Sequence, residues 1–143
     1  MDLHLKGKNA LITGASKGIG LAIAKSLAAE GCHVKLASRT EKNLNAAATE
    51  IRTSHGVKVE IHLADLSESD DREILANNCK DINILINNAG SIPRGGLEHI
   101  DDAQLREAWE LKLFGYINLT RNIYSRMKAR GSGVIVNVIG SAA

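Results

Sequence analysis

Short apolar runs alternate with stretches of helical spacing along the chain. The runs are rich in Val, Ile and Leu, as is typical of strands, and lie at 9–13, 33–37, 57–63, 82–87 and 133–139. The stretches between them open with a Gly, Thr, Ser or Asp that can cap a helix, and lie at 18–30, 41–54, 67–79 and 101–130. This strict alternation predicts parallel strands joined by right-handed crossovers, with helices on both faces.

The predicted fold is therefore an α/β, doubly wound parallel sheet in three layers. Near-continuous apolar character at 82–86 and 134–139 favours central strands covered on both faces. No linker or repeat interrupts the pattern, so residues 1–143 are expected to form one domain, with the single proline, Pro93, in a loop. Because strand 133–139 has no later element to cover its edge, we expect a partial domain from a longer protein rather than an edge covered by another chain.

Composition narrows the class of protein only slightly. The 18 basic and 16 acidic residues give a net charge of +2, which does not suggest a general nucleic-acid binder or a polybasic membrane anchor. The start of the chain lacks a signal-peptide core and no run is long enough to span a membrane, so a cytoplasmic protein is expected. Cys32 and Cys79 are expected inside regular elements as free thiols, with neither a disulfide nor a zinc site.

A glycine-rich loop follows the first predicted strand and leads directly into a helix. Its sequence is Thr13-Gly14-Ala15-Ser16-Lys17-Gly18-Ile19-Gly20. Gly14 permits a tight turn, Gly18 lets the backbone approach a pyrophosphate, and Gly20 allows the helix to pack closely on the strand. The helix N-terminus supplies amide donors and a favourable dipole, so this loop is expected to hold a dinucleotide.

Four motifs in this order resemble the short-chain dehydrogenase/reductase family, which has a T-G-x-x-x-G-x-G loop. Beyond the loop, Asp65-Leu66 resembles the pair that holds the adenine ring, and 87–90 resembles the N-N-A-G motif. Residues 136–141 resemble the fifth strand with its catalytic serine. The resemblance implies a Rossmann-type sheet of order 3-2-1-4-5. It also implies an oxidoreductase that interconverts an alcohol and a carbonyl by hydride transfer.

The end of the second predicted strand bears on the choice of nicotinamide cofactor. A carboxylate there would accept from a ribose 2′-OH, but the sequence has Ser38-Arg39 instead. Arg39 offers a planar fork for phosphate oxygens and Lys17 adds a second cation, so NADP(H) is preferred and NAD(H) is possible. The alternative is that both are solvated surface charges. The expected cofactor-binding residues are Gly14, Ser16, Lys17, Gly18, Ile19, Gly20, Ser38, Arg39, Asp65, Leu66, Asn88, Ala89 and Gly90.

The catalytic pattern of the family is only partly present. Ser141 matches its serine, but the tyrosine and lysine of its Y-x-x-x-K motif would lie beyond Ala143. Tyr116 and Tyr124 precede Ser141 and are not expected to match that motif or to substitute. The competing hypothesis is therefore a nucleotide-binding or interaction fragment without turnover. Whether the reading frame continues into a Y-x-x-x-K helix discriminates the two.

Lys112 occupies the position where the family usually has an asparagine. It shares a helical face with Leu105, Trp109 and Tyr116, and this face is expected to point inward. The ammonium either takes part in a proton relay, which makes Lys112 a catalytic candidate beside Ser141, or reaches solvent or a helix-end carbonyl.

The predicted helix 101–130 carries all four aromatic residues and is apolar most of the way round. The resemblance implies that its outer side pairs with a second copy, in a homodimer or homotetramer. The expected ligand besides the cofactor is a small alcohol or carbonyl compound, whose identity the loop at 91–100 is too generic to specify.

Overall fold

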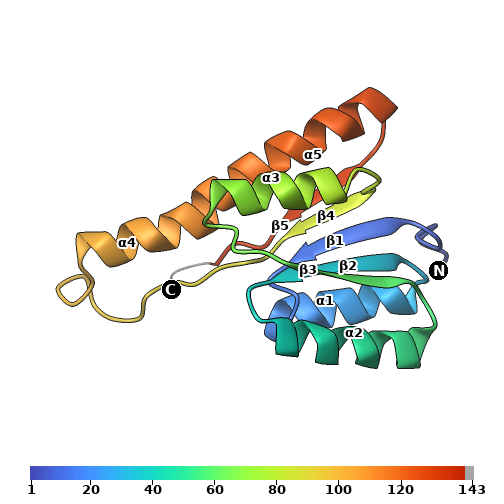
Figure 1. Ribbon diagram of the computed structural model, residues 1–143, viewed down its shortest axis with the longest axis horizontal. Coiled ribbons are helices and arrows are strands. Elements are labelled where there is room, and N and C mark those ends of the chain that lie inside the picture. Colours follow the sequence, from blue (N-terminus) through green and yellow to red (C-terminus); the bar gives the residue numbers. More distant parts are fainter. Residues whose placement is uncertain (141–143) are drawn as a thin grey trace.

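Five parallel strands form the centre of the protein, for which a computed structural model describes residues 1–140. The sheet order is β3-β2-β1-β4-β5, as expected (Figure 1). The strands are β1 (Asn9–Thr13), β2 (His33–Ser38), β3 (Val59–Leu63), β4 (Ile84–Asn87) and β5 (Val134–Asn137).

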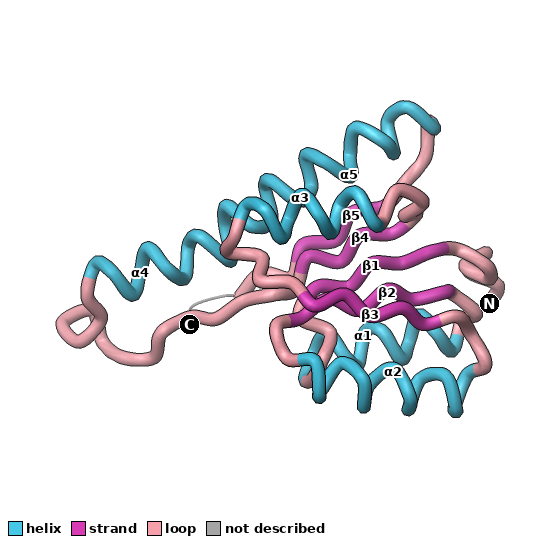
Figure 2. The backbone as a smooth tube through the Cα atoms, in the orientation of Figure 1, coloured by secondary structure: helices cyan, strands magenta, loops and turns pink. Residues whose placement is uncertain are grey.

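Helices cover both faces of the sheet and complete three layers. Figure 2 shows α1 (Gly18–Ala29) and α2 (Glu41–His55) on one face, and α3 (Ser69–Asn78) and α5 (Tyr116–Arg130) on the other. Alternate residues of β1 supply both cores: Ala10 and Ile12 pack with α1 and α2, whereas Leu11 packs with α3 and α5. A strand buried on both faces needs apolar residues at successive positions, which explains the continuous apolar runs.

The predicted helix 101–130 is interrupted by a π-helical segment. It consists of α4 (Asp102–Trp109), the π-helix η1 (Glu110–Gly115) and then α5, with an Asp101/Gln104 capping box at its start. A π-turn contains more residues than an α-turn. The side-chain faces of the helix after it are therefore rotated relative to those of the helix before it. As Figure 1 shows, α4 continues the line of α5 past the end of the sheet.

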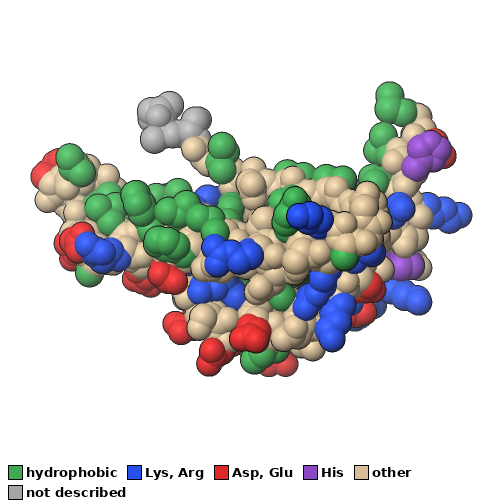
Figure 3. Space-filling model, turned by 90° about the horizontal axis from the view of Figure 1, so that it is seen from above, with side chains coloured by type: hydrophobic (Ala, Val, Ile, Leu, Met, Phe, Trp, Pro, Cys, Tyr) green, Lys and Arg blue, Asp and Glu red, His purple; other side chains and the backbone are tan. Residues whose placement is uncertain are grey.

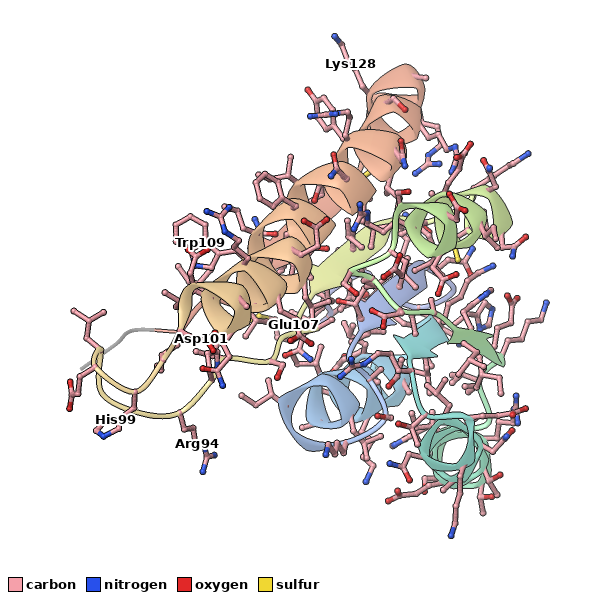
Figure 4. All side chains as sticks on the ribbon, turned by 60° about the vertical axis from the view of Figure 1, so that its left-hand side comes forward. Arg94, His99, Asp101, Glu107, Trp109 and Lys128 are labelled. Carbon is pink, nitrogen blue, oxygen red and sulfur yellow. The ribbon has the colours of Figure 1, made fainter. Side chains whose placement is uncertain are left out.

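This rotation contradicts the single inward face expected for Leu105, Trp109, Lys112 and Tyr116. Leu105 is 38% exposed and Trp109 is 60% exposed, whereas Tyr116 is only 9% exposed. Figure 4 shows Trp109 pointing away from the sheet. A fixed spacing of 3.6 residues relates positions correctly only within α4 or within α5, so the prediction fails across η1.

Strand β5 and the two cysteines also differ from expectation. β5 is an edge strand of the described chain, with Val134 and Val136 exposed, and is not covered on both faces. Cys32 lies in the turn before β2 and Cys79 is the C-cap residue of α3, so neither lies inside a regular element. Both are buried free thiols, and burial raises the pKa of Cys79 to about 12. Among residues 1–140, no helix has the length and apolar composition needed to cross a bilayer.

Candidate functional site

A cleft of about 720 Å³ lies at the carboxyl ends of the strands, where open α/β sheets bind their ligands. The loop between β1 and α1 forms its middle wall. Residues 37–40, at the end of β2 and just after it, line one end, and residues 138–140, after β5, line the other. The strand order separates these two ends, because β2 and β5 lie on opposite sides of β1.

The N-terminus of α1 opens onto the cleft and fits an anionic group. Lys17, its N-cap residue, makes no side-chain capping bond, and the first turn contains no acidic residue. Gly18 has φ +57, and a Cβ there would meet no atom of residues 1–140 within 4 Å, so its backbone faces open space in the described part of the chain. Uncapped amide donors and this open space are the features that hold a pyrophosphate.

Thr13, at the end of β1, joins the glycine loop to the end of β4. Its hydroxyl donates to the carbonyl of Ile86 and accepts from the backbone amides of Asn88, at 2.9 Å, and Ala89, at 3.0 Å. The Asn88 side chain donates back to the carbonyls of Thr13, at 3.0 Å, and Gly14, at 3.3 Å. Thr13 was missed as an organising residue, although a buried hydroxyl at the end of an apolar strand is a usable signal.

Asn87, the last residue of β4, links this strand to α5 and to β5. Its side-chain amide donates to Thr120 Oγ1 on α5 and to Asn137 Oδ1 on β5, both at 2.9 Å. It is fully buried, so these bonds fix the lateral position of β5.

The end of the cleft beside β2 contains the residues expected to choose the cofactor. Ser38 Oγ donates to Ser16 Oγ at 3.0 Å, which holds the glycine loop against the end of β2. Arg39 Nη1 lies 3.8 Å from Asp65 Oδ2 and keeps most of its surface exposed. No carboxylate lines this end among the described residues, so the guanidinium remains available to a phosphate.

Asp65 acts on Arg39 and does not itself line the cleft, although the next residue, Leu66, does. Its carboxylate accepts from the backbone N of Ser67 at 3.0 Å and from its Oγ at 2.6 Å. Partial burial acts to raise the pKa of Asp65, but the Ser67 hydrogen bonds and the Arg39 charge outweigh it and leave the pKa lowered.

Four basic side chains, and no acidic ones, belong to the described residues that line the cleft: Lys17, Arg39, Arg94 and Lys112. Arg94 was missed because its loop looked generic. In Figure 4 it projects from the segment between β4 and α4. The cleft therefore carries positive charge at both of its ends.

Lys112 extends from η1 to the β5 end of the cleft. Its Nζ donates to the hydroxyl of Tyr116 at 2.8 Å and to the carbonyl of Val138 at 2.7 Å. The Tyr116 hydroxyl also donates to Val138, at 3.1 Å. Burial lowers the pKa of Lys112 and raises that of Tyr116 to about 12. The ammonium thus bonds to the carbonyl of the residue that follows β5, rather than to a helix end or to bulk solvent.

Two further catalytic expectations concern Ser141 and Tyr124. Ser141 lies outside the described residues. The expectation that Tyr124 matches no motif was wrong for its spacing, because Tyr124 and Lys128 are four residues apart. Tyr124 is mostly exposed, and Figure 4 shows Lys128 pointing outward at the far end of α5. Neither residue lines the cleft, so this pair does not supply the missing tyrosine and lysine.

A doubly wound parallel sheet with an uncapped glycine-loop helix at its cleft defines a dinucleotide-binding α/β protein. Residues 8–143 match the family model described as short chain dehydrogenase. The chain belongs to the short-chain dehydrogenase family.

Comparison with two relatives shows what share of their length the chain covers. It is 38% identical over 142 residues to a fatty acyl-CoA reductase of Acinetobacter baylyi, covering 94% of this chain and 48% of that protein. It is 34% identical over 140 residues to human 17-beta-hydroxysteroid dehydrogenase type 3, covering 95% and 45%. The chain spans about half the length of these relatives.

Solved structures agree with the fold and include complexes with a cofactor. L-Sorbose reductase from Gluconobacter frateurii, complexed with NADPH and L-sorbose, superposes with a TM-score of 0.90 at 33% identity, covering 96% of this chain and 54% of that one. A metagenomic short-chain oxidoreductase in complex with NADP gives a TM-score of 0.90 at 34% identity, covering 96% and 64%.

Proposed function

We propose that the protein containing this chain is an NADP(H)-dependent oxidoreductase that interconverts an alcohol and a carbonyl on a small organic substrate. The observation that carries the proposal is the cleft, whose lining among residues 1–140 has four cations and no carboxylate around an uncapped helix N-terminus. Both solved neighbours described above contain NADPH or NADP, which supports the same cofactor here.

The described residues fit the cofactor in the following way. The amides at the start of α1 would receive the pyrophosphate, and Gly18 leaves space for it. Lys17 and Arg39, with the hydroxyls of Ser16 and Ser38, would hold the 2′-phosphate. Leu66 and residues 88–90 would line the rest of the cleft in which the cofactor lies. When bound, the cofactor supplies or accepts the hydride.

The β5 end of the cleft would contain the chemistry. Lys112 Nζ lies there, positioned by the Tyr116 hydroxyl 2.8 Å away, and can exchange a proton with a water or a substrate oxygen in the cleft. Ser141 would donate a hydrogen bond to the substrate oxygen at the carboxyl end of the same strand. We therefore propose Lys112 and Ser141 as catalytic residues of the family reaction.

The preference for NADPH over NADH should depend on Arg39 and Lys17. Replacing both with methionine removes two charge-assisted contacts, each worth about 1.5–3 kcal/mol, so the ratio of the two dissociation constants should fall at least tenfold. Isothermal titration calorimetry measures both constants. The double variant Arg121→Met/Lys128→Met removes equal charge from exposed positions on α5 and should leave the ratio unchanged. Equal affinities in the unaltered protein would contradict the NADP(H) assignment.

The outward face of α4, η1 and the start of α5 is proposed to pair with a second copy of the chain. Its exposed apolar side chains are Leu105, Trp109, Leu113, Phe114 and Ile117. Figure 3 shows hydrophobic side chains gathered along this part of the molecule. An apolar stripe of this kind commonly marks a protein interface.

Trp109→Glu/Leu113→Glu should shift the protein from dimer or tetramer to monomer in light scattering after gel filtration. Two carboxylates on the stripe would be desolvated in the assembly but remain hydrated in the monomer. Ile74→Glu, on exposed α3, provides the control and should not change the mass. A monomeric unaltered protein would refute this pairing.

A further inference from the structure

Lys112 introduces a positive charge into the cleft without an acidic partner among residues 1–140. Its Nζ bonds to one hydroxyl and one carbonyl, both neutral acceptors. No carboxylate pairs with it within residues 1–140, and none lines the described cleft. An ammonium has three N–H donors, so one remains for the cleft. The charge is therefore held in place but not neutralised.

This charge lies at the opposite end of the cleft from Lys17 and Arg39. Lys112 packs between the segments that follow β4 and β5. A Cβ on Gly90 would come within 2.9 Å of its Cδ, and Val138 accepts from its Nζ. If the 2′-phosphate is held at Arg39 and the pyrophosphate at α1, the nicotinamide half extends toward Lys112. The inference therefore rests on the proposed function.

We infer that Lys112 makes the cleft distinguish the oxidation states of the cofactor and bind NADPH more tightly than NADP⁺. The oxidised nicotinamide ring carries one positive charge and the reduced ring is neutral, whereas the phosphates are the same in both. A fixed ammonium at that end repels only the oxidised ring. Across a partly hydrated cleft, this repulsion corresponds to about threefold to thirtyfold in binding constant.

The preference for NADPH over NADP⁺ favours one direction of the reaction. A protein that holds NADPH and releases NADP⁺ is suited to reduce a carbonyl rather than to oxidise an alcohol. Lys17 and Arg39 cannot produce this preference, because the phosphates that they would contact do not change charge on oxidation. Lys112 is therefore a specificity-determining residue for cofactor oxidation state.

Equilibrium binding tests this role without measuring turnover. NADPH and NADP⁺ are titrated separately into the complete gene product and its variants. Lys112→Met removes the charge yet leaves the Val138 carbonyl with its bond from Tyr116. It should tighten NADP⁺ and lower the NADP⁺/NADPH ratio of dissociation constants about threefold to thirtyfold. Lys112→Arg keeps the charge and should retain the ratio.

Two further variants separate charge from local structure. Tyr116→Phe removes two hydrogen bonds, the one accepted from Lys112 and the one donated to Val138, but keeps the ammonium, so the ratio should be retained. Lys17→Met should weaken both cofactor forms by the same factor. If Lys112→Met has a much lower melting temperature, Lys112→Gln replaces it as the uncharged variant.

The outcomes for this inference and for the proposed function are distinguishable. A ratio that falls in the uncharged variants but not in Lys112→Arg supports the inference. A ratio unchanged by loss of the charge, with both cofactors still bound, overturns the inference and leaves the proposed function intact. If the unaltered protein binds neither cofactor, the proposed function fails and the inference fails with it.

Discussion

Gly20→Ala should destabilise the protein and weaken cofactor binding, although alanine is the better helix former. In an ordinary helix interior, alanine would contribute about 0.5–1 kcal/mol more than glycine. At Gly20, however, an added Cβ would lie closer than 3.0 Å to the carbonyl oxygen of Gly14 and 2.5 Å from Nδ2 of Asn88. Both neighbours are fixed, one by the backbone and the other by its bonds to the end of β1. The glycine loop or α1 must therefore move.

The clash should outweigh the gain in helix propensity. Overpacking of this kind costs about 1–3 kcal/mol or more, and Gly20→Val should cost more than Gly20→Ala. Because the displaced loop carries the amides that we propose to bind the pyrophosphate, NADPH affinity should fall at least tenfold for alanine and roughly a hundredfold for valine. Thermal unfolding and calorimetric titration measure the two effects.

Gly56→Ala is the matched control for this prediction. Gly56 has φ +66 and ends α2, with no atom within 4 Å of an added Cβ. Alanine there should lower stability by about 1 kcal/mol through backbone strain and leave NADPH affinity unchanged. A Gly20→Ala protein with unchanged melting temperature and affinity would show that the close approach to Gly14 does not exist in solution.

The sheet could be predicted because the sequence patterns that specify it are local. Burial of β1 and β4 on both faces requires uninterrupted apolar residues, and each crossover between parallel strands requires a helix. These two constraints produce an alternation that is visible without any long-range contact. Strand β5 shows the limit of this argument. It has the same apolar pattern as β4, but lies at the edge of the described sheet with Val134 and Val136 exposed.

The orientation of the long helix could not be predicted, because η1 breaks the periodicity on which the prediction depends. A spacing of 3.6 residues places Trp109 and Lys112 on one face, whereas the structure separates them. Nothing in the segment 110–115 marks a π-turn by composition alone. Gly115 is a partial signal that the helix backbone makes a close contact at this point, because a Cβ there would lie 3.0 Å from the carbonyl oxygen of Leu66.

The two ends of the cleft also differ in how far their residues could be predicted from the sequence. The glycine loop and the Ser38-Arg39 pair follow directly from β1 and β2, so their position is determined once the strands are known. The other end depends on contacts between distant segments. Lys112 meets a carbonyl 26 residues away, and Arg94 reaches the cleft from a loop without regular structure. Sequence spacing carries no information about either contact.

Lys112→Met should reduce hydride transfer by roughly 10²–10⁴-fold if the ammonium passes a proton, whereas Lys112→Asn should remain within about tenfold of the unaltered protein. Asparagine is the residue that the family usually has here and can restore a polar path. Methionine cannot hold a proton. The measurement is single-turnover hydride transfer from NADPH at saturating cofactor, so that altered affinity does not enter the rate.

Stability provides the independent check on Lys112→Met. Burial lowers the pKa of Lys112 in the folded protein, so between that pKa and 10.5 the unfolded chain binds more protons. Stability contributed by this residue therefore rises with pH through that window, and below it the buried charge is a cost. The methionine variant avoids this cost and should melt at the same or a slightly higher temperature at neutral pH.

The two proposed roles of Lys112 are separable because they depend on different properties of the side chain. Lys112→Asn removes the charge but keeps a polar group, so it should lose the preference for NADPH over NADP⁺ while retaining turnover. Lys112→Arg should retain the preference but transfer the proton poorly, because a guanidinium does not deprotonate. A fully active Lys112→Met protein with normal stability would exclude the proton relay, and the ratio of NADP⁺ and NADPH dissociation constants would remain the separate test of the charge.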